Sequence, residues 1–247
     1  MRQRRRMSEH RTAVFWPVVA ILKPLLLTLT EPHWSGGTNI PAEGGVVIAA
    51  THVSHLDPFT FSLFLYDQGR LPRFLAKSEL FGIPVARRIL TATGQIPVHR
   101  LSADAAQAFA AAVAAVQQGK AVVVYPEGTL TRQPDLWPMV GKTGAARIAL
   151  ASGAPVVPVA QWGANEILYP YAKRPTLRLR MPVHARAGPP VDLDDLRGRP
   201  LTPELTREAT DRIMAAITSL LEEIRGEQAP AERFDHRADP HGGRSAP

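Results

Sequence analysis

The chain of 247 residues contains no cysteine. Disulfides, thiolate metal ligands and a cysteine nucleophile are therefore excluded, and the composition suits a reducing compartment. Only 6% of the residues are aromatic, and the chain has neither a phosphate-binding glycine loop nor a dinucleotide-binding fingerprint. Basic residues beyond the N-terminus are scattered, and no nucleic-acid recognition motif is present. We therefore predict no nucleic-acid partner.

The chain also lacks a long uninterrupted apolar run. Residues 12–34 (TAVFWPVVAILKPLLLTLTEPHW) are mostly apolar, but Lys23 and Pro24 lie near the middle. A membrane-spanning helix needs about 20 predominantly apolar residues, and we find no small-residue cleavage site typical of a signal peptide. The segment is therefore predicted to be helical and to lie in the membrane interface, with Trp16 and Trp34 as anchors. The alternative is a buried first helix that follows a disordered basic tag.

Positive charge is present but unevenly distributed. The formal net charge is +7, and residues 1–11 (MRQRRRMSEHR) supply +4 of it, with five arginines against one glutamate. Such a basic arm attracts anionic lipid headgroups. We therefore predict an anionic membrane surface as a partner, and a peripheral or monotopic location on the cytoplasmic face of the cell membrane.

Beyond residue 40, short apolar runs rich in β-branched residues alternate with helical stretches. The strand-like runs are residues 45–50, 71–76, 95–98, 121–125 and 156–160, and the helical stretches between them are residues 58–69, 102–119 and 142–153. This alternation predicts an α/β fold with a mostly parallel central sheet flanked by helices.

The C-terminal third completes the predicted domain, which covers residues 35–226. Residues 176–181 (TLRLRM) alternate like a late strand, and residues 201–226 predict a closing amphipathic helix with Thr202 as its cap. Residues 227–247 are polar and contain almost nothing apolar, so we predict a disordered tail.

The stretch ATHVSHLDPF (50–59) follows the first buried strand, where open α/β sheets collect ligands and reacting groups. Across a strand-to-helix turn, Asp57 can fold back toward the imidazole of His52. An aspartate bonded to one ring nitrogen fixes the tautomer, raises the basicity of the other nitrogen and stabilises the imidazolium. Such a pair needs no protein nucleophile when the substrate supplies a hydroxyl.

Two other interpretations of this stretch stay open. Asp57 and Pro58 can simply begin a helix, with Ser54 and Asp57 as a variant of the capping box. His52, His55 and Asp57 can also be metal ligands, as in a metal-dependent phosphoesterase, although no further ligand cluster is evident. We assign no metal and no cofactor, and we interpret Ser54 as a capping residue.

Three later stretches carry further candidates. GQIPVHR (94–100) ends in Arg100, whose guanidinium can hold a phosphate by two parallel hydrogen bonds. In VVVYPEGTLTR (122–132), Gly128 lets backbone N–H groups approach a ligand, while Glu127 and Thr129 offer a carboxylate and a hydroxyl. A plain strand-ending turn would use the same residues. APVVPVA (154–160) is a buried strand with two prolines, which suggests an edge or a special role.

The four blocks in this order, His-x4-Asp, G-x5-R, P-E-G-T and V-P-V-A, resemble those of the glycerolipid acyltransferases. The resemblance covers about residues 35–190. It implies an α/β fold and transfer of a fatty acyl group from acyl-CoA or acyl carrier protein to a glycerol hydroxyl. The expected acceptor is a lysophospholipid, 1-acyl-glycerol-3-phosphate, acylated at its free sn-2 hydroxyl to give phosphatidic acid in phospholipid biosynthesis.

The resemblance also implies roles for single residues. It makes His52 the general base, Asp57 its orienting partner and Arg100 a phosphate ligand. It places the acceptor near Glu127, Gly128 and Thr129 and the acyl donor near Pro158, and we expect backbone N–H groups around Gly128 to be candidates for stabilising the oxyanion.

The chain departs from the family pattern at Leu130, where an arginine is frequent; the next basic residue is Arg132. This departure leaves another lysolipid or hydroxylated acceptor as an alternative. A non-catalytic membrane lipid-binding protein is the alternative that needs no reacting pair.

Overall fold

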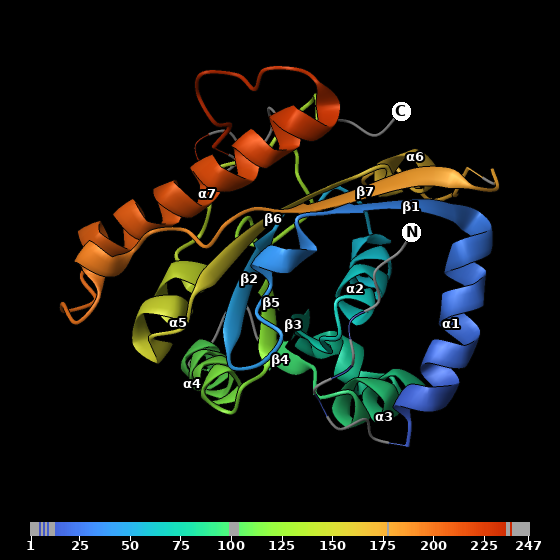
Figure 1. Ribbon diagram of the computed structural model, residues 1–247, viewed down its shortest axis with the longest axis horizontal. Coiled ribbons are helices and arrows are strands. Elements are labelled where there is room, and N and C mark those ends of the chain that lie inside the picture. Colours follow the sequence, from blue (N-terminus) through green and yellow to red (C-terminus); the bar gives the residue numbers. More distant parts are fainter. Residues whose placement is uncertain are drawn as a thin grey trace.

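The computed structural model describes residues 13–98, 104–176 and 178–235, together with Arg5, Met7, Glu9 and Ala238 (Figure 1). Within these residues seven strands form one sheet in the order β1-β7-β6-β2-β5-β3-β4. They are β1 (Thr30–Ser35), β2 (Val46–Ala50), β3 (Pro72–Lys77), β4 (Ile96–Val98), β5 (Ala121–Val124), β6 (Val156–Trp162) and β7 (Met181–Ala187).

Neighbouring strands pair in parallel except β6 and β7, which pair antiparallel, so β1 and β7 run against the other five. This confirms the predicted mostly parallel α/β sheet. Five strand predictions lie within two residues of the observed bounds. The prediction of a strand at 176–181 was wrong, because β7 begins only at Met181. Leu179, one of the apolar residues in the alternating pattern, is exposed.

Helices cover both faces of the sheet (Figure 1). They are α1 (Phe15–Leu29), α2 (Asp57–Asp67), α3 (Pro84–Ala92), α4 (Asp104–Gln117), α5 (Gly144–Ser152), α6 (Ala164–Ile167) and α7 (Pro203–Arg225), with 3₁₀ turns η1 (Gly37–Asn39), η2 (Ser78–Gly82) and η3 (Asp194–Leu196). Val47 and Ala49 of β2 pack against α5 and α7 in one core cluster. Val46 and Ile48 pack against α2 in the other. Because successive strand residues point to opposite faces, a continuous apolar run fits a strand buried on both sides.

The N-terminal segment is shorter as a helix than predicted. Residues 12–34 were expected to be helical, but α1 ends at Leu29 and Thr30–Ser35 form β1, an edge strand paired with β7. Pro32 is tolerated there because it lies on an edge strand. Trp34 therefore belongs to the sheet, and its indole Nε1–H donates to Asp67 Oδ2 at 3.4 Å. Its predicted role as a membrane anchor stays a prediction.

Lys23, which interrupts the apolar run, joins α1 to the rest of the domain by an ion pair. Its Nζ lies 2.9 Å from Oδ1 of the buried Asp67 at the end of α2. The side of α1 that bears Phe15 and Leu26 faces the domain. The rest of the helix surface exposes Trp16, Ile21 and Leu25, with Ile21 71% exposed. Among the helices of the described ranges, none has the length and apolar character needed to cross a membrane.

Two residues of the basic arm contact the domain. The main-chain N–H of Arg5 donates to the carbonyl of Asp67, and Arg5 Nη1 donates to the carbonyl of Ile40. The Glu9 carboxylate lies 3.4–3.5 Å from Arg70, Arg73 and Lys120. These contacts tie Arg5 and Glu9 to the domain, while the contact of the arm with lipid headgroups stays a prediction. The other four arginines of residues 1–11 lie outside the described residues.

The folded chain also continues past residue 226, where the tail was predicted to be disordered. The N–H of Ala229 donates to Glu222 of α7, and the N–H of Val140 donates to the carbonyl of Phe234. Residues 227–235 therefore pack on the domain, which corrects the predicted boundary. Phe234 and the main-chain contacts fix this segment, and neither is evident from a polar composition.

Candidate active site

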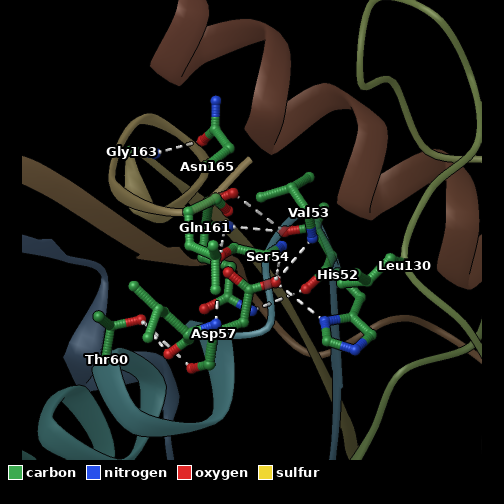
Figure 2. Close-up of polar contacts among 12 residues, drawn as sticks. His52, Val53, Ser54, Asp57, Thr60, Leu130, Gln161, Gly163 and Asn165 are labelled. Carbon is green, nitrogen blue, oxygen red and sulfur yellow. Dashed lines mark hydrogen bonds and ion pairs between the residues drawn. The ribbon is translucent and has the colours of Figure 1, made fainter. Parts of the chain in front are cut away.

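His52 and Asp57 meet at the carboxyl end of β2, where the chain turns into α2 (Figure 2). His52 Nδ1 lies 2.9 Å from Asp57 Oδ2. Asp57 is fully buried, and the His52 side chain keeps 16% of its surface exposed. With its Nδ1–H donated to the carboxylate, the imidazole retains a lone pair on Nε2. The arrangement makes Nε2 the basic nitrogen.

Main-chain groups hold the Asp57 carboxylate in place. Oδ2 also accepts the N–H groups of Val53 at 2.6 Å and Ser54 at 2.8 Å. Both donors precede Asp57 in the chain, so this carboxylate does not cap α2, whose N-cap residue Leu56 makes no side-chain cap bond. Ser54 Oγ accepts the N–H of Leu56 and donates to the carbonyl of Leu168. Ser54 therefore orders the turn before α2 but does not cap the helix, whose N-cap is Leu56, so the interpretation of Ser54 as a capping residue is corrected.

Neighbouring rings fix the imidazole plane. The His52 ring stacks on Tyr125, with centroids 4.0 Å apart and an interplanar angle of 11°. Tyr125 in turn stacks on Phe74 of β3. Burial and the charge of Asp57 raise the pKa of Tyr125 well above its ordinary value, so the phenol stays neutral. The sequence analysis did not identify Tyr125 as a site residue, because stacking between residues on different strands depends on the sheet order.

The dyad opens on an apolar cavity of about 980 Å³. Side chains from α1, α2, β3, α3 and α4 line most of it, including Val18, Leu63, Leu75 and Phe109. Around the dyad the lining changes to His52, His55, Lys77, Gly128, Thr129 and Lys142, while Arg147 packs over the ring of Phe109. The cavity therefore joins an apolar space to a basic region beside the imidazole, which we call its basic end.

The turn after β5 brings Gly128 and Thr129 to the cavity. Gly128 has a positive φ of 70°, and a Cβ there would lie 2.8 Å from Lys142 Nζ, so only glycine fits without strain. Its N–H donates to the carbonyl of Tyr125 at 2.9 Å. The turn therefore uses the N–H of Gly128 itself, and stabilisation of an oxyanion by the neighbouring N–H groups stays a prediction. Thr129 lines the cavity, and its contact with a substrate stays a prediction.

Glu127 lies in a different place from the one predicted. The sequence analysis assigned it to the acceptor, but its side chain is buried and is not part of the cavity lining. Oε2 accepts the N–H of Met139 at 3.0 Å. Burial raises the pKa of Glu127 to about 8, opposed by main-chain hydrogen bonds from Met139 and His52. The carboxyl group therefore braces the backbone of His52 against the loop around Met139.

A pH-dependent stability follows from this burial. A carboxyl group whose pKa is about 8 in the folded protein keeps a proton that the unfolded chain loses near pH 4.5. Stability therefore falls as the pH rises between these values and changes little above pH 8. We expect Glu127→Gln, which stays neutral, to gain in melting temperature relative to the wild type between about pH 5 and pH 8. Glu204→Gln, at an exposed position, should show no such trend, and an equal trend in both variants would refute the assignment.

Of the remaining candidate site residues, the structure describes some and not others. Arg100 lies outside the described residues, so its predicted phosphate contact stays a prediction. Arg132, the next basic residue after Leu130, packs over the ring of Tyr171 at 5.9 Å and is not in the cavity lining. His55 is exposed, and partial burial together with the charges of His52 and Lys77 lowers its pKa.

Gln161 of β6 braces the strand end before His52 and was missed by the sequence analysis. Thr51 Oγ1 donates to the Gln161 carbonyl and accepts its N–H, while Gln161 Nε2 donates to the Thr51 carbonyl at 2.7 Å. The two residues are 110 positions apart, so only the pairing of β2 with β6 reveals this contact. No group of three or more acidic, histidine or cysteine side chains suited to a metal occurs in the part of the chain that the structure describes.

The protein is a mostly parallel α/β protein with a His–Asp pair beside an apolar cavity. Residues 32–162 match the model of the Acyltransferase family. The match covers more than half of the chain, which therefore belongs to this family.

Several curated relatives share the same description. The chain is 33% identical over 132 residues to a 1-acyl-sn-glycerol-3-phosphate acyltransferase of Borreliella burgdorferi, an alignment covering 53% of this chain and 51% of the relative. It is 30% identical over 166 residues to a chloroplastic 1-acyl-sn-glycerol-3-phosphate acyltransferase of Brassica napus, covering 66% and 45%. The chain thus spans about half the length of these curated relatives.

A solved structure supports the fold. The crystal structure of the 1-acyl-sn-glycerophosphate acyltransferase PlsC from Thermotoga maritima aligns with a TM-score of 0.60 and 24% sequence identity. The alignment covers 81% of this chain and 75% of that one. At this identity the likeness establishes the shared α/β architecture.

Proposed function

We propose that this protein transfers a fatty acyl group from acyl-CoA or acyl carrier protein to the sn-2 hydroxyl of 1-acyl-glycerol-3-phosphate, giving phosphatidic acid in phospholipid biosynthesis. The observation that carries the proposal is the His52–Asp57 dyad at the basic end of the apolar cavity. The cavity, at about 980 Å³, is at the upper end of ~300–1,000 Å³ for small-molecule sites. A fatty acyl chain is a ligand of matching size and polarity.

In the proposed mechanism Nε2 of His52 takes the proton from the acceptor hydroxyl as its oxygen attacks the thioester carbonyl carbon. The carbon–sulfur bond then breaks, and the imidazolium returns its proton to the leaving thiolate. Asp57 stabilises the imidazolium through the bond to Nδ1. No covalent acyl-enzyme, metal or cofactor is required, because the substrates supply both the nucleophile and the leaving group.

The basic end of the cavity supplies charge for an acceptor phosphate. Lys77 and Lys142 line it close to the dyad, and Arg100 is the further candidate predicted from the sequence. Leu130, where the family often has arginine, is 3% exposed and brings no charge to this end. Because this arginine is absent, a second class of acceptor is also tested, a lysolipid whose headgroup carries less negative charge.

Attachment to a membrane fits the outer side of α1. Trp16, Ile21 and Leu25 are exposed there, while Lys23, the basic residue within the helix, points to Asp67 instead. A helix that is apolar on both sides is stable only when both are covered, by protein on one and by lipid on the other. We therefore propose a peripheral or monotopic protein on the cytoplasmic face of the cell membrane.

The proposal is tested by measuring acyl transfer in mixed micelles. Long-chain acyl-CoA and acyl carrier protein are compared as donors, with 1-acyl-glycerol-3-phosphate and zwitterionic lysolipids as acceptors, each with and without EDTA. We expect phosphatidic acid as the main product, at a rate that EDTA leaves unchanged. Loss of all activity in EDTA would favour the metal-dependent alternative, and product only from zwitterionic acceptors would favour the second acceptor class.

A further inference from the structure

The segment η2–α3 (residues 78–92) is an apolar surface that the rest of the described chain does not cover. None of its residues is buried. Ile83 is 53% exposed and Val85 is 72% exposed, and Leu80 and Ile89 are exposed as well. An ordinary surface helix turns its apolar stripe toward the core. In α3, by contrast, Val85 faces the outside of the protein and Ile89 lines the cavity.

The charges of α3 complement the apolar stripe. Val85 and Ile89 are four residues apart and share one side of the helix, Arg87 lies on the opposite side, and Arg88, three residues after Val85, lies beside the apolar stripe. Both arginines are exposed, and α3 contains no acidic residue. Glu79 of η2 is the acidic residue of the segment, which leaves it a net charge of +1. An apolar face backed by arginines is typical of a helix that lies in a membrane interface.

The position of the segment relative to the cavity favours the same partner. Leu80, Ile89 and Leu90 line the cavity together with Val18 and Leu22 of α1. In the view of Figure 1, α3 lies at the N-terminal end of α1. The cavity therefore lies between two helices that both expose apolar side chains to the outside.

We propose that η2–α3 is a second membrane-contact surface, separate from α1, which inserts Leu80, Ile83 and Val85 into an anionic bilayer with Arg87 and Arg88 on the headgroups. The inference rests on the proposed function, whose acceptor and product reside in a bilayer. With α1 and α3 both in the interface, the cavity between them opens toward lipid. The acceptor then reaches His52 from the bilayer without crossing water.

The test measures binding of the purified full chain to phosphatidylcholine vesicles with and without phosphatidylglycerol, by co-sedimentation. Ile83→Asp/Val85→Asp is expected to weaken binding to both vesicle types by about tenfold or more. Arg87→Gln/Arg88→Gln is expected to weaken binding to the anionic vesicles alone, by about fivefold for each arginine at low salt.

The matched control variants change residues around the start of α7, far from η2–α3 in the sequence. Leu201→Asp replaces a leucine that is 41% exposed before α7, and Arg199→Gln/Arg207→Gln removes two exposed arginines there. These variants should bind vesicles as the wild type does. Melting temperatures check that every variant is folded, which is expected because Ile83 and Val85 are exposed.

Vesicle binding and acyl transfer are measured in separate assays. Neither Ile83 nor Val85 lines the cavity, so acyl transfer in detergent micelles should stay within about twofold of the wild type. Wild-type vesicle affinity in the folded variants would overturn the proposal. So would unchanged vesicle affinity combined with lost binding to acyl carrier protein, which would make the segment a protein-docking site. Failure of acyl transfer in the wild type, with vesicle binding behaving as expected, would refute the proposed function alone.

Discussion

Replacement of His52 by alanine is expected to lower acyl transfer by about 10²- to 10⁴-fold, the usual contribution of a positioned general base. The structure places this imidazole at the end of the apolar cavity, with one nitrogen on Asp57 and the other available to a substrate hydroxyl. Without it, the hydroxyl must lose its proton to water. The rate is measured with saturating donor in mixed micelles, so that kcat and KM are separated.

The control for this variant is His33→Ala. His33 lies on the edge strand β1, stacks on His184 and is not part of the cavity lining. We expect His33→Ala to keep wild-type activity and His52→Ala to keep its melting temperature within a few degrees. Activity that persists in folded His52→Ala protein would refute the assigned mechanism.

The dyad could be predicted from the sequence because it is local. Five residues separate His52 from Asp57, and the apolar run before them identifies the strand end at which they lie. The same holds for most of the sheet, since strands buried on both faces are continuous apolar runs. These features depend on neighbours along the chain, which the sequence displays directly.

The parts that could not be predicted depend on contacts between distant segments. Glu127 follows a strand and resembles a ligand-binding carboxylate, but the loop around Met139 folds over it and supplies an N–H. Lys23 interrupts an apolar run, and its partner Asp67 is 44 residues away. Thr51 and Gln161 form a reciprocal set of bonds only because β2 and β6 are neighbours. In each case the partner of a polar residue is far away in the sequence and becomes evident only in the fold.

These occupied groups explain how the imidazole is held. The carbonyl of His52 accepts the N–H of Thr131 at 2.8 Å, its main-chain N–H faces Glu127, and its ring lies on Tyr125. Catalysis by a positioned base depends on such restraint, because small displacements of a reacting group cost large factors in rate. The turn after β5 therefore acts on the reaction through His52 as well as through the cavity surface.

Two substitutions of Asp57 are expected to separate its catalytic support from its structural role. Asp57→Asn keeps an amide oxygen that can accept the N–H groups of Val53 and Ser54, but it removes the negative charge beside the imidazole. We expect its kcat to fall by about 10²- to 10⁴-fold, comparable to loss of the histidine, because the imidazolium formed in the reaction loses its counter-charge.

Asp57→Ala is expected to lose stability as well. It leaves two buried main-chain N–H groups without an acceptor, at a cost of about 1–3 kcal/mol each. Chemical denaturation should therefore show Asp57→Ala as the less stable variant by about 2–6 kcal/mol, with Asp57→Asn near the wild type. If folded Asp57→Asn instead kept wild-type kcat, Asp57 would only anchor the turn, and His52 would act without a charged partner. The kcat of Asp57→Asn at wild-type stability decides between these two roles, since an anchoring role alone does not change it.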